Sequence, residues 1–383
     1  GRRCQTLHLA AGLAGLHNTP LCAYSDGPNS TSWGASVLHA PEDGRYYMWV
    51  ASMVNNCTMG EWTTNSEVVL AESPSPLGPF RRVKTIVPPW AHNPQAIRAP
   101  DNISASGAVY ALFTLGDGRA YHGQPKNCGP APPPPPRPLG PPAVWGKGPC
   151  PKDAAHAMPL GGCVLANFTI FWSATAAGEY QEHIAQIVGW PTHSRGRPWS
   201  YGPYGNWNPA PLVHPNGTVY LLAHTEQFGF KHGEALLAAD TWRGPYRLVA
   251  SDSDARWGGS TANAEDPFMW IDQRGNWHQL VEGNPMPGGH AWSADGIRWS
   301  NISGANGEFA REGCFNLSRP YRAANGSVVN ISYYTERPKL LLAADRTPMA
   351  LFGTVYETVA GEGASDGAIT RGFTIAEPLG STA

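Results

Sequence analysis

The chain has 383 residues, of which 44 are glycine and 37 are proline, whereas only 15% are charged. So few charges exclude a coiled coil, and an aromatic content of 10% excludes a disordered chain. The net charge of −2 leaves no basic surface for nucleic acid, and no apolar run reaches the ~20 residues that span a bilayer. The even spread of turn-forming residues instead favours many short strands.

A repeated motif begins five segments of the chain. Each has a polar or small residue before a short apolar run, and in chain order they are residues 33–38, 92–97, 208–213, 265–270 and 336–341. Their proline positions, or Ala35 in the more degenerate first copy, are 59, 115, 58 and 71 residues apart. A repeat at this interval is typical of the blades of a β-propeller.

Turn motifs divide the repeats into strands. Hairpin signals between alternating apolar runs occur at residues 42–44, 215–217 and 273–275. A third strand then leads to a glycine-containing corner, at residues 78–80, 178–180, 244–246 and 295–297. We therefore predict an all-β fold, a five-bladed β-propeller with four antiparallel strands per blade. A two-sheet sandwich also suits regular hairpins, but it does not explain the repeated proline starts.

We predict a single domain over residues 1–383. The interval of 115 residues contains only one third-strand corner, so it holds one blade with an insertion, at about residues 117–162 within blade 2. A polyproline run at residues 132–136 marks this insertion as a surface excursion. Because the last copy is short, we expect the segment before Trp33 to supply a strand that closes the ring.

Glycosylation motifs and cysteines indicate the secretory pathway. The pattern Asn-x-Ser/Thr occurs at Asn29, Asn56, Asn102, Asn167, Asn216, Asn301, Asn316, Asn325 and Asn330. Seven cysteines agree with an oxidising compartment, and Cys128, Cys150 and Cys163 flank the insertion, where a local disulfide is expected. We expect a secreted or lumenal, N-glycosylated protein. The alternative is that a chain rich in Asn, Ser and Thr produces such motifs by chance.

The blade starts carry a family resemblance. The motifs are Trp-Gly-x-Ser, His-Asn-Pro, Asn-Pro, Glu-Asp-Pro and Glu-Arg-Pro. They resemble the propeller superfamily of arabinanases, levansucrases and invertases, most of all glycoside hydrolase family 43 and an uncharacterised branch of it. The likeness covers essentially the whole chain except the insertion. It implies cleavage of furanosides, pyranosides or fructans by an Asp base, an Asp that tunes pKa and a Glu acid at the axial funnel.

The candidate catalytic residues lie at two blade starts. Glycosidic cleavage needs one protonated and one ionised carboxyl group, and Glu265, Asp266 and Glu336 are the carboxylates best placed by spacing. The chain departs from the family at Gly34, where the family has its catalytic Asp, and Asn208 also replaces an acid. The alternatives are that Asp266 caps its strand and that Glu336 and Arg337 form a buried ion pair.

The candidate substrate-binding residues surround these carboxylates. In a propeller the blade starts meet at the funnel, so we expect Asn93, Asn208 and Arg337 there, with His92 beside them. Trp33 and Trp207 are predicted to stack on a sugar ring, and His290 to contact the site, although a core histidine is the alternative. Asp26 would reach the funnel only from a loop. Tryptophans within strands are expected in the core: Trp49, Trp270, Trp277 and Trp292.

These observations predict a secreted glycosidase of the family 43 type that acts on a poly- or oligosaccharide by carboxylate acid–base chemistry. The alternative is a non-hydrolytic carbohydrate-binding propeller that has lost the family's acid set, and a third class is a protein-interaction propeller. We expect no required cofactor, with an axial Ca²⁺ left open. We expect no nucleic-acid partner, no membrane insertion and a monomer.

Overall fold

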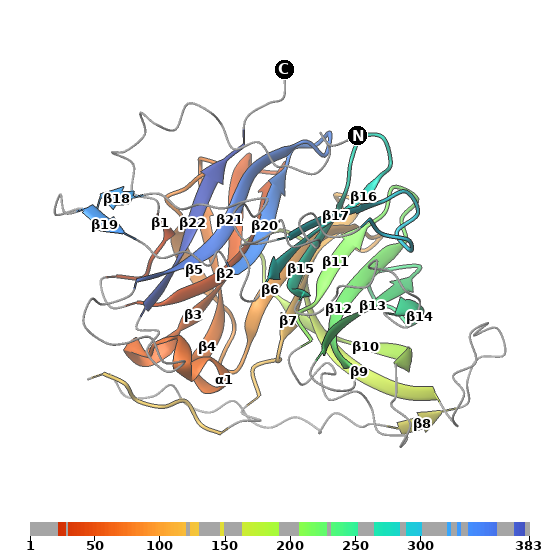
Figure 1. Cartoon of the computed structure of the whole chain (residues 1–383), viewed down its shortest axis with the longest axis horizontal. Coiled ribbons are helices and arrows are strands. Elements are labelled where there is room, and N and C mark those ends of the chain that lie inside the picture. Colours follow the sequence, from red (N-terminus) through yellow and green to blue (C-terminus); the bar gives the residue numbers. More distant parts are fainter. Residues whose placement is uncertain are drawn as a thin grey trace.

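The structure is a computed structural model. It describes residues 22–27, 30–119, 123–129, 146–148, 163–190, 207–227, 231–251, 264–283, 289–300, 320–322, 328–330, 336–357 and 371–379. Within these ranges the chain is almost entirely β, with strands β1 to β22 and one short α-helix, α1 (Trp62–Asn65) (Figure 1). None of the helices within these ranges has the length and apolar character needed to cross a membrane.

The first sheet is a four-stranded antiparallel meander. It consists of β2 (Ser32–Ala40), β3 (Arg45–Met53), β4 (Ser66–Ser73) and β5 (Arg81–Val87) in sequence order. The predicted 42–44 hairpin joins the first two strands, and Gly44 adopts a φ of 72° that favours glycine. The hairpins at Gly217 (φ 93°) and Gly275 (φ 85°) are formed in the same way, so all three hairpin predictions are confirmed.

Two further meanders share one nine-stranded sheet. The first contains β6 (His92–Pro100), β7 (Ala108–Leu115), β9 (Cys163–Ser173) and β10 (Gln181–Trp190), with β8 (Gly146–Gly148) paired to β9. The second contains β11 (Ala210–Val213), β12 (Val219–Gln227), β13 (Lys231–Ala239) and β14 (Tyr246–Ser251). Their last strands, β10 and β14, pair in parallel. Strand β7 pairs directly with β9, although the two are separated by 47 residues in the sequence.

The remaining strands form three smaller sheets. One contains β15 (Ala264–Ile271), β16 (Trp277–Gly283) and β17 (Gly289–Ser293), and another pairs β18 (Pro320–Arg322) with β19 (Val328–Asn330). The last contains β20 (Glu336–Leu342), β21 (Pro348–Glu357), β22 (Arg371–Pro378) and β1 (Cys22–Tyr24). The N-terminal strand β1 therefore pairs with the C-terminal strand β22, as predicted.

The first strands of the five meanders lie around one centre. β2 contacts β6, β6 contacts β11, β11 contacts β15, β15 contacts β20, and β20 contacts β2 again. Figure 1 shows the closing contact, where the blue strand β20 lies beside the orange strand β2. The predicted motifs therefore begin strands that enclose a common axis.

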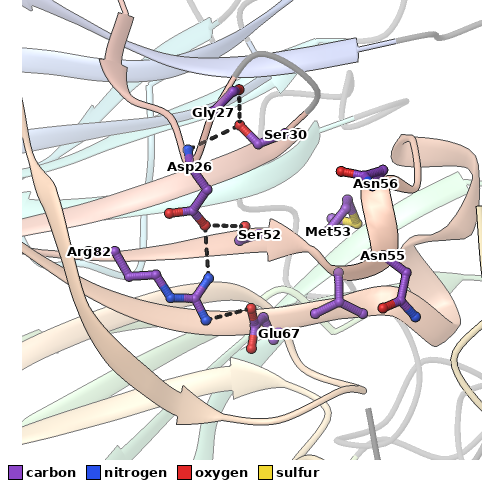
Figure 2. Close-up of a pocket in the computed structure, with 10 residues that line it drawn as sticks. Asp26, Gly27, Ser30, Ser52, Met53, Asn55, Asn56, Glu67 and Arg82 are labelled. Carbon is purple, nitrogen blue, oxygen red and sulfur yellow. Dashed lines mark hydrogen bonds and ion pairs between the residues drawn. The ribbon is translucent and has the colours of Figure 1, made fainter. Parts of the chain in front are cut away.

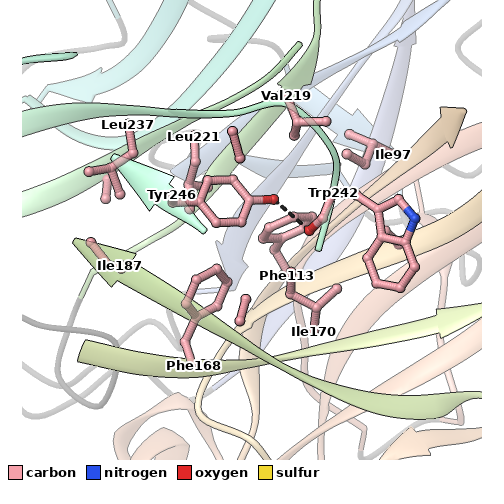
Figure 3. Packing of buried hydrophobic residues seen from close by; sticks show 14 of the residues in the cluster. Ile97, Phe113, Phe168, Ile170, Ile187, Val219, Leu221, Leu237, Trp242 and Tyr246 are labelled. Atoms are coloured by element: carbon pink, nitrogen blue, oxygen red, sulfur yellow. Dashed lines mark hydrogen bonds between the residues drawn. The ribbon is translucent and has the colours of Figure 1, made fainter. Parts of the chain in front are cut away.

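The largest apolar core lies between the two meanders of the nine-stranded sheet (Figure 3). Phe113 and Phe168 pack against Tyr246, with ring centroids 6.3 and 5.5 Å away, and the Tyr246 hydroxyl donates to the Trp242 carbonyl at 2.8 Å. Three of the four tryptophans expected in cores are buried, namely Trp49, Trp270 and Trp277. The prediction for Trp292 is wrong, because this side chain is 39% exposed on β17, an edge strand of its sheet.

One disulfide joins distant parts of the described chain. Cys57 bonds to Cys128, 71 residues away. The expectation that Cys128 pairs locally with Cys150 or Cys163 is therefore wrong. Among the glycosylation motifs, Asn56, Asn102 and Asn216 are exposed and Asn167 is half-buried. Asn330 lies in β19, and the motifs at Asn29, Asn301, Asn316 and Asn325 lie outside the described residues.

Candidate functional site

Each of the five central strands has a residue in the left-handed backbone conformation within, or just before, its first three residues. These residues, which we name the start ring, are Gly34 (φ 53°), Asn93 (φ 44°), Asn208 (φ 40°), Asp266 (φ 49°) and Arg337 (φ 55°). Glycine, Asn and Asp tolerate this conformation best, whereas for most other residues it costs about 1–2 kcal/mol. Arg337 is therefore the strained member, and its side chain must supply compensating contacts.

The start ring is a buried polar network centred on one ion pair. Arg337 Nη1 donates to Asp266 Oδ1 at 2.7 Å and to Asn208 Oδ1 at 3.3 Å. Asn93 Nδ2 also donates to Asp266 Oδ1, at 3.2 Å. Asp266 is 3% exposed and Arg337 8%, so both charges are withdrawn from water. The network ties together the starts of four meanders that are far apart in the sequence.

Arg337 also explains the glycine at position 34. A Cβ atom added to Gly34 would lie 2.7 Å from Cδ of Arg337, which is closer than real Cβ atoms approach a neighbour. The stem of Arg337 thus fills the space into which a side chain at position 34 would project. A larger side chain at this position, such as the Asp that the family resemblance implies, would therefore collide with Arg337.

Substitution of Gly34 by alanine is expected to destabilise the protein by about 2–4 kcal/mol, from left-handed strain together with overpacking. Urea unfolding of the variant measures the change. The matched control is Gly107→Ala, because Gly107 has a similar φ of 68° but no atom within 4 Å of its added Cβ. Equal losses in the two variants would contradict the role of Arg337, since strain alone would then explain both.

Lys339 contacts the start ring and was not predicted from the sequence. Its side chain is 2% exposed, and Nζ donates to Asn93 Oδ1 at 2.9 Å. Burial lowers the pKa of Lys339 to about 7; the positive charge of Arg337 also lowers it, whereas Asp266 raises it. One feature of the sequence could have indicated this position: a lysine, Lys339, stands directly before Leu340 and Leu341 within a predicted strand, where a charged side chain is unusual.

Lys339 should make stability depend on pH. Between its folded pKa of about 7 and its unfolded value near 10.4, the unfolded chain binds more protons than the folded one, so stability rises with pH. We expect Lys339→Met to remove a rise of about 2 kcal/mol between pH 7.5 and 9.5, measured by urea unfolding. Buried tyrosines such as Tyr180, whose pKa is raised by burial, oppose this only above about pH 10. An unchanged pH slope would contradict this assignment.

The start ring does not suit an axial calcium ion. Calcium binds six to eight oxygen ligands. The oxygen acceptors of the network already face cations of the protein, because Asp266 Oδ1 and Asn208 Oδ1 accept from Arg337 and Asn93 Oδ1 accepts from Lys339. A divalent ion here would also be repelled by the positive charge of Arg337. In the part of the chain that the structure describes, no group of three or more His, Cys, Asp or Glu side chains could hold a metal.

His92 lies beside the ring but is enclosed. Its Nδ1 is 2.7 Å from the Ser66 hydroxyl, and its imidazole packs on Trp62 with centroids 5.2 Å apart. Burial, together with the charges of Arg337 and Lys339, holds the pKa of His92 well below its usual range. His92 is therefore a neutral, buried imidazole that packs next to the start-ring residue Asn93 and contacts Ser66 and Trp62.

The two tryptophans predicted to stack on sugar are covered. Trp33 and Trp207 are both buried, and Nε1 of Trp207 donates to the Thr114 carbonyl at 3.1 Å. Phe168 packs edge-on against Trp207 at 5.0 Å. Stacking on a ligand needs an exposed ring face, which neither indole has in this structure, so both act as packing residues at their strand starts.

His290 packs within its own sheet. Its Nε2 is 3.0 Å from Nδ1 of His278, and the two imidazoles stack with Trp270. Nε2 of His278 in turn lies 3.4 Å from the Asp272 carboxylate. This arrangement matches the core histidine that was the alternative for His290.

The glutamates lie next to the ring. Glu336 is half-buried at the start of β20, and Glu265 lies in β15 opposite Glu282 of β16. Strands β15 and β20 contact each other, and the Asp266–Arg337 ion pair joins the residues that follow the two glutamates. Asp26 is not part of the ring network; its carboxylate pairs with Arg82 at 2.8 Å.

The fold formed by these strands occurs in known glycoside hydrolases. A family 117 glycoside hydrolase from the marine bacterium Zobellia galactanivorans is 13% identical, with a TM-score of 0.50 over 91% of this chain and 84% of that chain. This similarity confirms the predicted resemblance at the level of the fold.

Two family 43 enzymes are also similar. One is a β-xylosidase/α-arabinofuranosidase from a compost metagenome, with 10% identity and a TM-score of 0.49 over 96% and 95% of the two chains. The other, from Xanthomonas citri and solved with xylotriose, has 13% identity and a TM-score of 0.47 over 98% and 94%. No protein-family model and no curated protein sequence matches this chain.

Proposed function

We propose that this protein is a glycoside hydrolase that acts on a poly- or oligosaccharide beside the start ring, with Glu265 and Glu336 as its carboxyl pair. The observation that carries the proposal is the buried Asp266–Arg337 ion pair of 2.7 Å. This pair links the residues directly after the two glutamates, and therefore holds the starts of β15 and β20 close together. The glycoside hydrolase fold supports the same activity.

The proposed mechanism divides the work among three acids. One glutamate donates a proton to the leaving oxygen, while the other, ionised, activates water or attacks the anomeric carbon. Asp266 differs from them because it is buried and accepts hydrogen bonds from both Arg337 and Asn93. We therefore assign Asp266 to positioning rather than to proton transfer.

Glu265→Gln and Glu336→Gln should each lower kcat by about 10²–10⁴-fold without loss of folding. The assay uses a panel of arabinans, xylans, galactans, fructans and aryl glycosides. The control is Glu72→Gln on β4, which alters a half-exposed ion pair with Arg45 of β3. If the parent protein is active and both Glu265→Gln and Glu336→Gln keep its activity, the assignment is wrong.

A second candidate is carbohydrate binding without hydrolysis. It is favoured by Gly34 and Asn208, which stand where the family resemblance implies acids, and by the Arg337 stem that fills the space beside Gly34. Saturable binding of a glycan by the parent protein, with no product over prolonged incubation, would select this candidate. A protein that neither binds nor cleaves glycans would contradict both candidates and favour the third class, a protein-interaction propeller.

We further propose a single domain of five blades, because five central strands contact one another in a closed order. The segment at about residues 117–162 would be an insertion in the second blade, since it lies between the paired strands β7 and β9. The Cys57–Cys128 disulfide supports a secreted or lumenal location, where the chain would be N-glycosylated. We also propose that the protein is a monomer.

A further inference from the structure

A polar cavity of about 370 Å³ opens near the first sheet, and no start-ring residue lines it (Figure 2). Its walls come from the loop after β1, the end of β3 and the following turn, and strands β4 and β5. The side chains that matter here are Asp26, Ser52, Asn55, Asn56, Glu67 and Arg82. All six side chains are polar, so the cavity suits a hydrophilic ligand.

One guanidinium organises the charged wall. Arg82 donates through Nη1 to Asp26 Oδ2 and through Nη2 to Glu67 Oε1, each at 2.8 Å, as Figure 2 shows. The Ser52 hydroxyl adds a hydrogen bond to Asp26 Oδ2 at 3.0 Å, and Thr85 donates to Glu67 Oε2 at 2.9 Å. Both carboxylates are thus held in place before any ligand arrives, which limits the entropy lost on binding.

The opposite wall is fastened to a distant segment. Asn55 and Asn56 are consecutive left-handed residues, with φ of 61° and 56°. Asn55 Nδ2 donates to the Lys126 carbonyl at 2.8 Å. Cys57, which follows Asn56, forms the disulfide with Cys128. The cavity therefore has two independently fixed sides.

We propose that this cavity binds a neutral sugar residue of the glycan on which the protein acts. Its formal charges are two carboxylates and one guanidinium, beside hydroxyl and amide groups that both donate and accept. Sugar hydroxyls also donate and accept, so they match this mixed set. The carboxylate of an acidic sugar would be repelled by Asp26 and Glu67, and a metal cation would be repelled by Arg82. The volume lies within the range of about 300–1,000 Å³ typical of small-ligand sites.

The inference rests on the proposed function for the ligand class, but its test is separate. The protein is made with disulfide formation and without N-glycosylation, because Asn56 begins a glycosylation motif at the cavity. Binding of xylose, arabinose, galactose, xylotriose, glucuronate and Ca²⁺ is measured by NMR chemical-shift titration. Glu67→Gln and Ser52→Ala are compared with the matched control Glu72→Gln, which lies on the same strand and pairs with Arg45 instead.

We expect at least one neutral sugar to bind the parent protein, and Glu67→Gln to weaken that binding tenfold or more. Ser52→Ala should weaken it less, and Glu72→Gln should leave it unchanged, with all variants folded by circular dichroism. Glu265→Gln and Glu336→Gln should retain binding in the cavity even when hydrolysis is lost. Retained binding in these variants separates the cavity from the proposed catalytic pair.

Three outcomes would overturn the inference. The first is hydrolysis of a glycan by a protein that binds none of the neutral sugars, which would leave the proposed function intact. The second is sugar binding that Glu67→Gln and Ser52→Ala do not alter. The third is binding of glucuronate or Ca²⁺ in preference to neutral sugars. Conversely, a parent that hydrolyses no glycan but loses sugar binding in Glu67→Gln would contradict the proposed function and support the cavity.

Discussion

Replacement of Asp266 by alanine is expected to lower the free energy of unfolding by about 3–5 kcal/mol, because it leaves the buried charge of Arg337 without its carboxylate partner. Arg337 is only 8% exposed and cannot regain water without opening the start ring. Urea unfolding monitored by tryptophan fluorescence measures the loss. The effect would exceed that expected for the surface ion pairs among the described residues, such as Arg45–Glu72.

Two further variants test the cause of that loss. The double variant Asp266→Ala/Arg337→Met should be more stable than Asp266→Ala alone, since it removes the orphaned charge as well as its partner. Glu72→Ala, which breaks the half-exposed pair with Arg45, should cost no more than about 1 kcal/mol. If the double variant were as unstable as Asp266→Ala, the ion pair would not be the source of the effect.

Removal of the Cys57–Cys128 disulfide is expected to destabilise the protein by about 4 kcal/mol, the loop-closure value for a loop of this length. The bond closes 71 residues of chain. The Cys57→Ser/Cys128→Ser variant is compared with the parent by urea unfolding under oxidising conditions. Because the crosslink restricts the unfolded chain, its removal should lower the urea midpoint and raise the m-value.

A reducing agent provides the control for the disulfide. The parent should lose most of this stability when reduced, whereas the double serine variant should change much less. Because five other cysteines are present, comparison of the two proteins isolates the bond in question. Equal sensitivity of both proteins to reduction would assign the stabilising bond to another pair of cysteines.

The sequence predicted the features of this fold that depend on local conformation. Gly44, Gly217 and Gly275 could be placed in hairpins because each turn needs a positive φ, which glycine adopts without strain. The five strand starts were found from the repeated motif of a polar or small residue, a proline or Ala35, and a short apolar run. Position in the repeat was sufficient to group these residues around one centre.

The packing of individual side chains could not be predicted in this way. Trp33 and Trp207 stand at strand starts, which suggested exposure at a funnel, yet neighbouring strands cover both rings. Trp292 has the same strand pattern as buried tryptophans but lies on an edge strand. Exposure depends on which strands lie next to one another, and a local pattern does not specify that.

By itself, the sequence determined the all-β class, the hairpins, the closing N-terminal strand and the residues of the start ring, because each follows from local backbone preference and repetition. Only the tertiary structure decided that Arg337 pairs with Asp266 and covers Gly34, that Lys339 reaches Asn93, and that Arg82 joins two carboxylates in a cavity. These contacts join residues 15 to 303 positions apart in the chain, from Glu67–Arg82 to Gly34–Arg337. Their energies arise from burial and charge pairing that exist only once the strands have assembled around the axis.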